Sequence, residues 1–209
     1  MRNKIAKVFM AMGIICIGFA MGLLLYNNFE NKKAQDNADV LLESVRISIT
    51  EQGEKKEPAD PFDKEMKIKE IDGYGYIGYL SIPALELDLP VMSDWDYDSL
   101  KISPCRYYGS TGTDNLVIAA HNYDSHFGSL DNLKAGDTVM FTDMESKTYY
   151  YTVTSVEELM PTDVDKVKDT GDDLILYTCT YSRAKRITVR CSYSDRVKIN
   201  DEKIKYNLQ

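Results

Sequence analysis

The distribution of hydrophobic residues divides the chain into three parts. Residues 8–26 form an uncharged apolar run, residues 27–72 are mostly polar, and from residue 73 onward short apolar runs alternate with turn residues. A helix of about 20 apolar residues is long enough to cross the hydrocarbon core of a bilayer. We therefore expect a basic tail over 1–7, a transmembrane signal anchor over 8–26, a connecting region over 27–72 and a folded domain over 73–209.

The charges beside the apolar run predict its orientation. Arg2, Lys4 and Lys7 precede it, and no acidic residue lies between them. Positive charge is retained on the cytoplasmic side, so we expect a single-pass membrane protein with its folded domain outside the cell. A cleaved signal peptide is the alternative. Its small-residue site, Gly18-Phe19-Ala20, would fall inside the apolar run, which favours an uncleaved anchor.

The connecting region contains one segment with a helical pattern. Leu42, Val45 and Ile49 recur at helical spacing within residues 38–49, which predicts a short amphipathic helix. Residues 27–36 are polar and are typical of a stalk. Residues 51–70 combine many charges with two prolines, so we expect a linker there.

The folded domain has the pattern of a mainly β protein. Several short β-like runs at close spacing, with few helices, indicate a closed or nearly closed β-barrel. Short helical stretches are expected at 97–102, 127–133 and 163–168. The expected strands cover residues 76–82, 85–92, 115–120, 137–142, 149–156, 174–180 and 187–193.

Composition argues against a nucleic-acid partner and against a metal or cofactor site. The formal charge of −8 disfavours a nucleic-acid partner, because binding phosphates needs a basic face. The four cysteines show no C-x-x-C spacing and there are only two histidines, so we expect no metal site and no cofactor. Cys105 and Cys191 are expected to be two separate buried thiols. A disulfide between them is the alternative, since the domain lies outside the reducing cytoplasm.

One strand–loop–strand segment brings together groups that suit nucleophilic catalysis. The apolar run that begins at Leu174 ends at Cys179, a polar loop follows, and a second β-like run begins at Arg186. This arrangement places the thiol and the guanidinium at the same edge of a sheet. Nearby positive charge favours the nucleophilic thiolate, and a guanidinium can donate hydrogen bonds to a developing oxyanion.

Acyl transfer from an amide also needs a group that protonates the leaving amine. His121 directly follows the apolar run 115–120, so it too is expected at a strand end. His126 is interpreted as a loop or pocket-rim residue. Arg190 lies about 13 Å further along its strand than Arg186 and should miss the site, and Arg183 lies in a loop.

These segments resemble the sortase family. The resemblance rests on Ile118–Asn122 (IAAHN), Phe127–Leu130 (FGSL), Tyr177–Cys179 (YTC) and Arg186–Val189 (RITV), and it extends over about residues 73–193. Ser81–Val91 is also similar to the opening strands of the family. Two supporting positions differ, because Ala120 and Ile175 stand where the family commonly has Gly and Thr.

The resemblance implies a fold and a reaction. Sortases of Gram-positive bacteria are eight-stranded β-barrels that act as cysteine transpeptidases, and the chain is most similar to the class B or class D groups. It implies Cys179 as nucleophile, His121 as general acid and then base, and Arg186 as oxyanion or substrate clamp, with Asn122 and Thr178 contacting substrate. The partners would be secreted proteins with a C-terminal sorting motif and a cell-wall precursor amine.

Two other functions fit the same residues. A pilin-polymerising sortase would carry a lid, and Asp60-Pro61-Phe62 is similar to the lid motif of that group. The other alternative is a catalytically inactive, anchored β-module that binds surface peptides. It predicts that Cys179 is buried beyond reach or lies far from His121.

Overall fold

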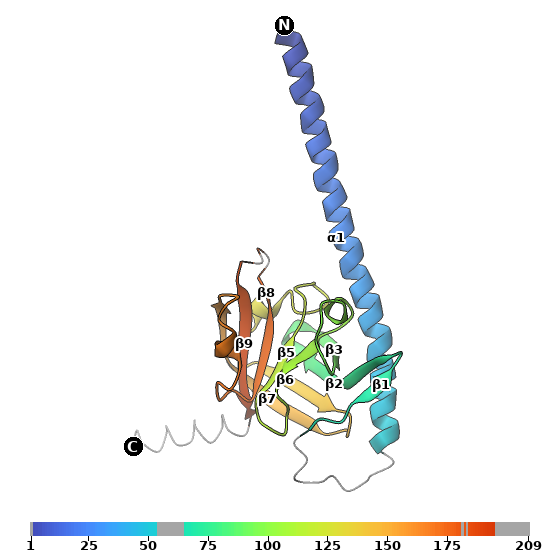
Figure 1. Cartoon of the computed structure of the whole chain (residues 1–209), viewed down its shortest axis with the longest axis vertical. Coiled ribbons are helices and arrows are strands. Elements are labelled where there is room, and N and C mark those ends of the chain that lie inside the picture. Colours follow the sequence, from blue (N-terminus) through green and yellow to red (C-terminus); the bar gives the residue numbers. More distant parts are fainter. Residues whose placement is uncertain (1, 54–64, 181, 183, 195–209) are drawn as a thin grey trace, which may run out of the picture. The chain divides into compact units, whose positions relative to one another are not determined.

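The computed structural model describes residues 2–53, 65–180, 182 and 184–194 (Figure 1). The chain divides into two compact units, residues 1–33 and 34–209, and the single long helix α1 (Arg2–Gly53) contributes to both. In the first unit, the side chains of residues 8–26 are all exposed. This part of α1 is long and apolar enough to cross a membrane, judged by length and composition.

In the second unit, the C-terminal part of α1 packs against the β-structure. Arg46 Nη2 lies 2.8 Å from Asp88 Oδ2, and the Ser146 hydroxyl donates to the Ile49 carbonyl at 2.9 Å. The helix expected over 38–49 therefore lies within α1. One face of this part is buried and carries the apolar residues Ala34, Ala38, Leu41, Leu42, Val45 and Ile49, which recur about once per helical turn.

The second unit is a closed eight-stranded β-barrel, as the resemblance implied. The ring runs β2-β3-β4-β5-β8-β9-β7-β6 and closes where β6 pairs with β2, and β1 adds a ninth strand beside β2. Among the strands of the described residues, β3–β4 and β5–β8 are the parallel pairs. The strands are β1 (Lys69–Ile71), β2 (Tyr74–Ile82), β3 (Leu87–Met92), β4 (Cys105–Tyr108), β5 (Leu116–Ala119), β6 (Thr138–Asp143), β7 (Thr148–Leu159), β8 (Leu174–Cys179) and β9 (Arg186–Tyr193).

The seven strands expected from the sequence are all present within a few residues of their expected bounds. Two were not expected, because β1 and β4 have only three and four residues. The three short helical stretches expected from the sequence fold as short 3₁₀ helices, η2 (Ser99–Lys101), η3 (Leu130–Asn132) and η4 (Val164–Val167). A fourth, η1 (Pro83–Leu85), was not expected.

The barrel interior is filled by alternate residues of the strands. Leu174 and Leu176 of β8 point inward with Val189 of β9, and all three are fully buried. Strands β2 and β6, which close the barrel, approach each other closely at Gly78, where a Cβ would lie 2.0 Å from the Thr142 carbonyl oxygen. Because side chains alternate across a strand, the residues between the inward ones face the outside of the barrel.

Candidate active site

Cys179 is the last residue of β8 and lies on the outer face of the barrel. It is half-buried, whereas Cys105 and Cys191 are fully buried free thiols, as expected, so the alternative disulfide is absent. Burial raises the pKa of Cys105 to about 12 and also raises the pKa of Cys191. Cys16 belongs to the apolar part of α1. Cys179 is therefore the cysteine that combines access to solvent with a place in the folded domain.

Arg186 lies directly across from Cys179 on the neighbouring strand. The antiparallel register of β8 and β9 pairs Cys179 with Arg186 and Tyr177 with Thr188. Directly opposed residues project to the same face of a sheet, so the thiol and the guanidinium share the outer face. Arg186 is half-buried and its Nη1 donates to the Lys185 carbonyl at 3.2 Å.

His121 belongs to the segment that continues β5, which lies on the opposite side of β8 from β9. The parallel register of β5 and β8 pairs Ala119 with Tyr177, and the Ala120 amide donates to the Tyr177 carbonyl at 3.1 Å. Two residues beyond that pair come His121 and Cys179. Since neighbouring strands lie about 4.8 Å apart, His121, Cys179 and Arg186 are carried by three adjacent chain segments, and we call these three residues the row.

Two residues expected to contact substrate connect these segments. Thr178 is buried on the inner face of β8, and its hydroxyl donates to the Ala120 carbonyl at 2.8 Å. Asn122 is half-buried, and its Nδ2 donates to the Thr180 carbonyl at 3.4 Å. Each bond links the histidine-bearing segment to the cysteine-bearing one, so both residues help to fix the spacing of the row.

His126 lies inside the loop rather than at a pocket rim. It is fully buried, and neither ring nitrogen has a hydrogen-bond partner among the described residues. Burial, followed by the charge of His121, lowers the pKa of His126 to about 4, so its imidazole is neutral at neutral pH. Tyr123 lies between the two histidines, with ring centroids 5.0 Å from His121 and 5.5 Å from His126.

Arg190, one of the two alternative arginines, is bound elsewhere. Arg190 is engaged by the carboxylates of Glu157 and Asp172, four residues along β9 from Arg186. Arg183 lies outside the described residues. In the part of the chain that the structure describes, no group of three or more Cys, His, Asp or Glu side chains is arranged to hold a metal ion.

An aromatic row that sequence reasoning missed extends from the reactive residues. Tyr177 lies two residues before Cys179 on the same face and stacks on Tyr107, with ring centroids 6.1 Å apart. Trp95 contacts Tyr107 at 5.3 Å. Burial raises the pKa of the Tyr177 phenol, while the charge and side-chain hydrogen bond of Arg186 act in the opposite direction. Tyr177 thus connects the guanidinium to the aromatic row.

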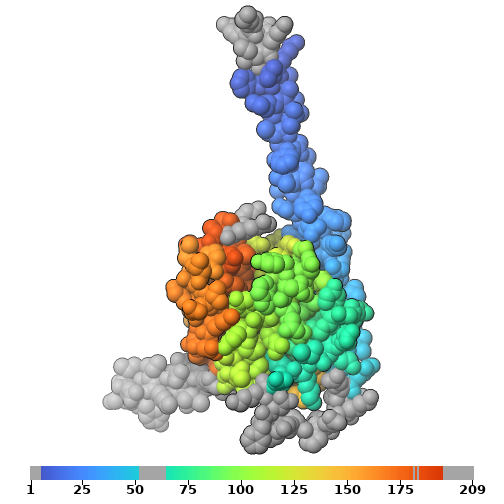
Figure 2. Space-filling model, viewed as in Figure 1, coloured from blue at the N-terminus to red at the C-terminus, as the bar shows by residue number. Residues whose placement is uncertain are grey.

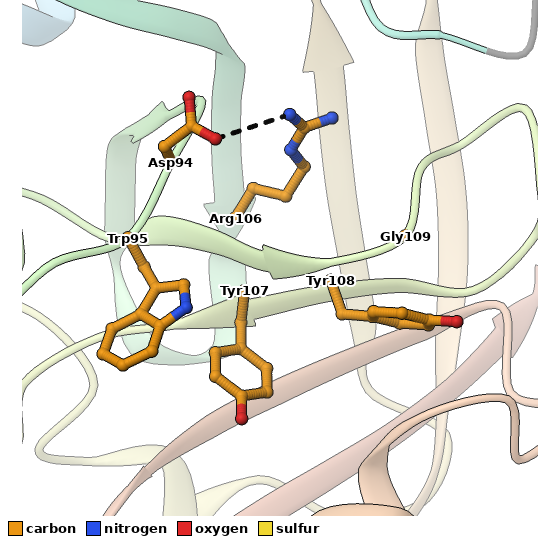
Figure 3. A pocket seen from close by; sticks show the side chains of 6 residues that line it. All are labelled: Asp94, Trp95, Arg106, Tyr107, Tyr108 and Gly109. Carbon is orange, nitrogen blue, oxygen red and sulfur yellow. Dashed lines mark ion pairs between the residues drawn. The ribbon is translucent and has the colours of Figure 1, made fainter.

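The far end of this row opens into a pocket of about 430 Å³ (Figure 3). Figure 3 shows the ring of Tyr107 beside Trp95, whereas Arg106 points to the other side of β4 toward Asp94. Arg106 Nη2 lies 3.9 Å from Asp94 Oδ1. The polar and aromatic lining consists of Asp94, Trp95, Arg106, Tyr107, Tyr108 and Gly109.

The pocket and the reactive row come from parts of the chain that are distant in sequence. In Figure 2 the late part of the chain, orange to red, lies directly beside the green segment that follows β3. This agrees with the strand order β4-β5-β8-β9. A thiol between an imidazole and a guanidinium has the groups that acyl transfer requires: a nucleophile, a proton carrier and an oxyanion donor.

The chain is similar in sequence and in fold to known sortases. Sortase A of Bacillus anthracis is 25% identical over 186 residues, which cover 85% of this chain and 88% of that protein. A Clostridium perfringens sortase D5 transpeptidase superposes with a TM-score of 0.54 at 19% identity, covering 72% of this chain and 98% of that one. A C. perfringens sortase C, solved with the C-terminal cell wall sorting motif, gives 0.52 at 23% identity, covering 78% and 94%.

The family itself follows from a sequence profile. The profile of the sortase domain matches residues 80–194, which include β3 to β9 and every residue of the row His121, Cys179 and Arg186. This match extends over more than half of the chain. The protein belongs to the sortase family of transpeptidases.

Proposed function

We propose that this sortase is a cysteine transpeptidase that cleaves a C-terminal sorting motif in secreted proteins and joins them to an amine of the cell wall. The observation that carries the proposal is that Cys179 and Arg186 are paired across β8 and β9, with the segment that bears His121 on the other side of β8. It is supported by the register that pairs Cys179 with Arg186, and by the β5–β8 pairing, which ends two residues before His121 and Cys179. The named relatives support the same reaction class.

The first half of the reaction forms a thioester. The Cys179 thiolate attacks the carbonyl carbon of a Thr in the sorting motif, and the resulting oxyanion accepts hydrogen bonds from the Arg186 guanidinium. Collapse of this intermediate breaks the peptide bond. The leaving amine takes a proton from the His121 imidazolium, and the C-terminal fragment departs.

The second half transfers the acyl group and restores the enzyme. Neutral His121 accepts a proton from the incoming cell-wall amine as the amine attacks the thioester carbonyl. The second oxyanion again lies beside Arg186. Its collapse forms the new amide bond and releases the Cys179 thiolate, which returns the site to a thiolate–imidazolium pair.

The first unit supports a membrane-anchored enzyme. Residues 8–26 of α1 are apolar and exposed, and they follow the basic residues Arg2, Lys4 and Lys7. We therefore propose a single-pass anchor with the barrel on the extracellular side, where secreted proteins and wall precursors meet. We further propose that the enzyme attaches one or a few surface proteins to the cell wall, as a class B- or D-like sortase would.

The two alternatives make different demands. An inactive β-module would need a thiol that is out of reach, and the half-buried Cys179 in register with Arg186 argues against it. A pilin polymerase would need a lid at Asp60–Phe62, which lies outside the described residues. Its acceptor would be a Lys side chain of another protein rather than a wall amine.

The test is cleavage of a panel of short sorting-type peptides by the full chain in a mild detergent, with and without added amines. We expect cleavage after Thr and, with an amine present, a ligated product detected by mass spectrometry. The panel should contain both a wall-type amine and a lysine-bearing peptide as acceptors. Cleavage of no peptide, together with alkylation of Cys179 only after denaturation, would contradict the proposal.

A further inference from the structure

The segment between β7 and β8, residues 160–173, covers part of the outer face that carries Cys179. Val167 in η4 is 1% exposed and packs against Val117 and Ile175, the residues on the outer faces of β5 and β8. Tyr107 and Tyr177 border the same cluster. Because Ile175, Tyr177 and Cys179 alternate along one face of β8, the segment forms a wall beside the line that leads away from the thiol.

A single guanidinium fastens both halves of this wall to the barrel. Arg190 of β9 forms an ion pair through Nε with Glu157 of β7. Its Nη1 lies 2.5 Å from Asp172 Oδ2, and its Nη2 donates to the Lys166 carbonyl at 2.7 Å. The Arg190 side chain is 17% exposed, so these charge-assisted bonds lie largely out of solvent.

The tip of the wall is fastened separately, to β4 and the residue that precedes β5. Asp169 accepts hydrogen bonds from the Tyr108 hydroxyl at 2.7 Å and from Asn115 Nδ2 at 2.8 Å. Lys168 Nζ lies 5.1 Å from the ring centroid of Tyr107 and 5.2 Å from that of Tyr108. The wall therefore spans from Arg190 on β9 to the tyrosines of β4.

We propose that Arg190 is a positioning residue that holds segment 160–173 as one wall of the peptide groove and thereby sets the affinity for the sorting peptide. This inference rests on the proposed function. The planar fork of arginine binds two carboxylates and a carbonyl at once, which a lysine ammonium does not reproduce with the same geometry. Removing the guanidinium leaves Glu157 and Asp172 without their shared cation, so the wall loosens while the reactive row keeps its strand register.

The test compares Arg190→Gln and Arg190→Lys with the wild-type full chain in detergent. For Arg190→Gln we expect the KM for the sorting peptide to rise about tenfold with kcat within about twofold, because the wall binds substrate without taking part in bond making. Arg190→Lys should recover part of the affinity. Alkylation of Cys179 by a small thiol probe should proceed at the wild-type rate, since the thiol and its neighbours are unchanged.

Position of the wall can be measured without substrate. The segment contains Lys166 and Lys168, so brief trypsin treatment followed by mass spectrometry reports its opening. We expect faster cleavage after these two residues in Arg190→Gln than in wild type. The matched control is Arg46→Gln, which removes an exposed arginine–carboxylate pair, that with Asp88, elsewhere in the same unit. Asp172→Asn provides a second, milder variant should Arg190→Gln fail to fold.

The outcomes separate the two proposals. A wild-type chain that cleaves no peptide would remove the proposed function, while the trypsin comparison would still decide whether Arg190 holds the wall. An active enzyme whose Arg190→Gln variant keeps its KM would overturn the inference, and so would unchanged protection of Lys166 and Lys168. A variant that loses kcat and Cys179 reactivity at constant KM would also overturn it, because Arg190 would then act on the reactive row.

Discussion

The two faces of β8 have different tasks in this molecule. Leu174, Leu176 and Thr178 face inward, where the two leucines fill the barrel and Thr178 holds the Ala120 carbonyl. Tyr177 and Cys179 face outward with Arg186. The inner face fixes the register of the strand, and that register alone decides which side chains meet on the outer face. Core packing and the proposed chemistry are therefore assigned to alternate residues of one strand.

The largest contrast is expected from the same substitution at two cysteines, one on each face. Cys179→Ala should abolish capture of a thioacyl-enzyme and lower peptide cleavage by about three orders of magnitude or more, with little change in stability. Cys191→Ala removes a fully buried thiol of the inner face of β9. It should keep transfer activity while the unfolding temperature falls. Thioacyl capture retained by Cys179→Ala would exclude this residue as the nucleophile.

A deletion on the inner face of β8 should show the opposite pattern. Leu176 is fully buried in the barrel core, so Leu176→Ala should lower the free energy of unfolding by about 2–5 kcal/mol. At temperatures where the variant is folded, kcat/KM should stay within about twofold of wild type. Denaturant titration and peptide kinetics on one preparation check both parts. A large loss of kcat/KM in the folded variant would mean that core packing, beyond strand register, controls the site.

The two histidines repeat this contrast between a supporting group and the group that we propose to react. His126 has a pKa of about 4 when folded, against an ordinary value of 6.5. Between these values the unfolded chain takes up a proton that the folded chain excludes, so stability falls as pH drops from about 6.5 to about 4. The loss should reach about 3 kcal/mol.

Replacing this imidazole with an apolar group isolates its contribution. In His126→Leu we expect a smaller loss of stability between pH 7 and pH 4 than in wild type, measured by urea unfolding of the full chain in detergent. Other carboxyl groups titrate in the same range, so the difference between the two proteins is the relevant quantity. Equal pH dependence would show that His126 accepts its proton without opening the fold.

The sequence predicted where the candidate site residues lie along their strands. Cys179, Arg186 and His121 each lie at the boundary of a strong apolar run, so their strand-end positions were readable. Thr178 was expected to contact substrate because it is adjacent to Cys179. The alternation of side chains along a β-strand instead places it on the inner face. That placement could have been predicted from the alternation in residues 174–179.

Other features depend on pairings between distant segments. The Tyr107 side of the pocket belongs to β4, whose four residues are too few to show a pattern. The bonds of Arg190 to Glu157 and Asp172 join residues 33 and 18 positions away. The burial of His126 follows from how the loop after β5 closes on itself, where the Gly128 amide donates to the Tyr123 carbonyl at 2.9 Å. No local spacing carries this information.

The smallest expected effect tests whether the outer face orients its own cation. Tyr177→Phe removes the phenolic oxygen that interacts with Arg186 and keeps the ring that stacks on Tyr107. The loss of one hydrogen bond to a charged group should lower kcat by about threefold to tenfold, or about 1 kcal/mol, with KM nearly unchanged. Tyr150→Phe, at an exposed tyrosine of β7, is the matched control. An unchanged kcat would mean that strand register and the Lys185 carbonyl suffice to orient the Arg186 guanidinium. Tyr177 would then have no part in orienting it.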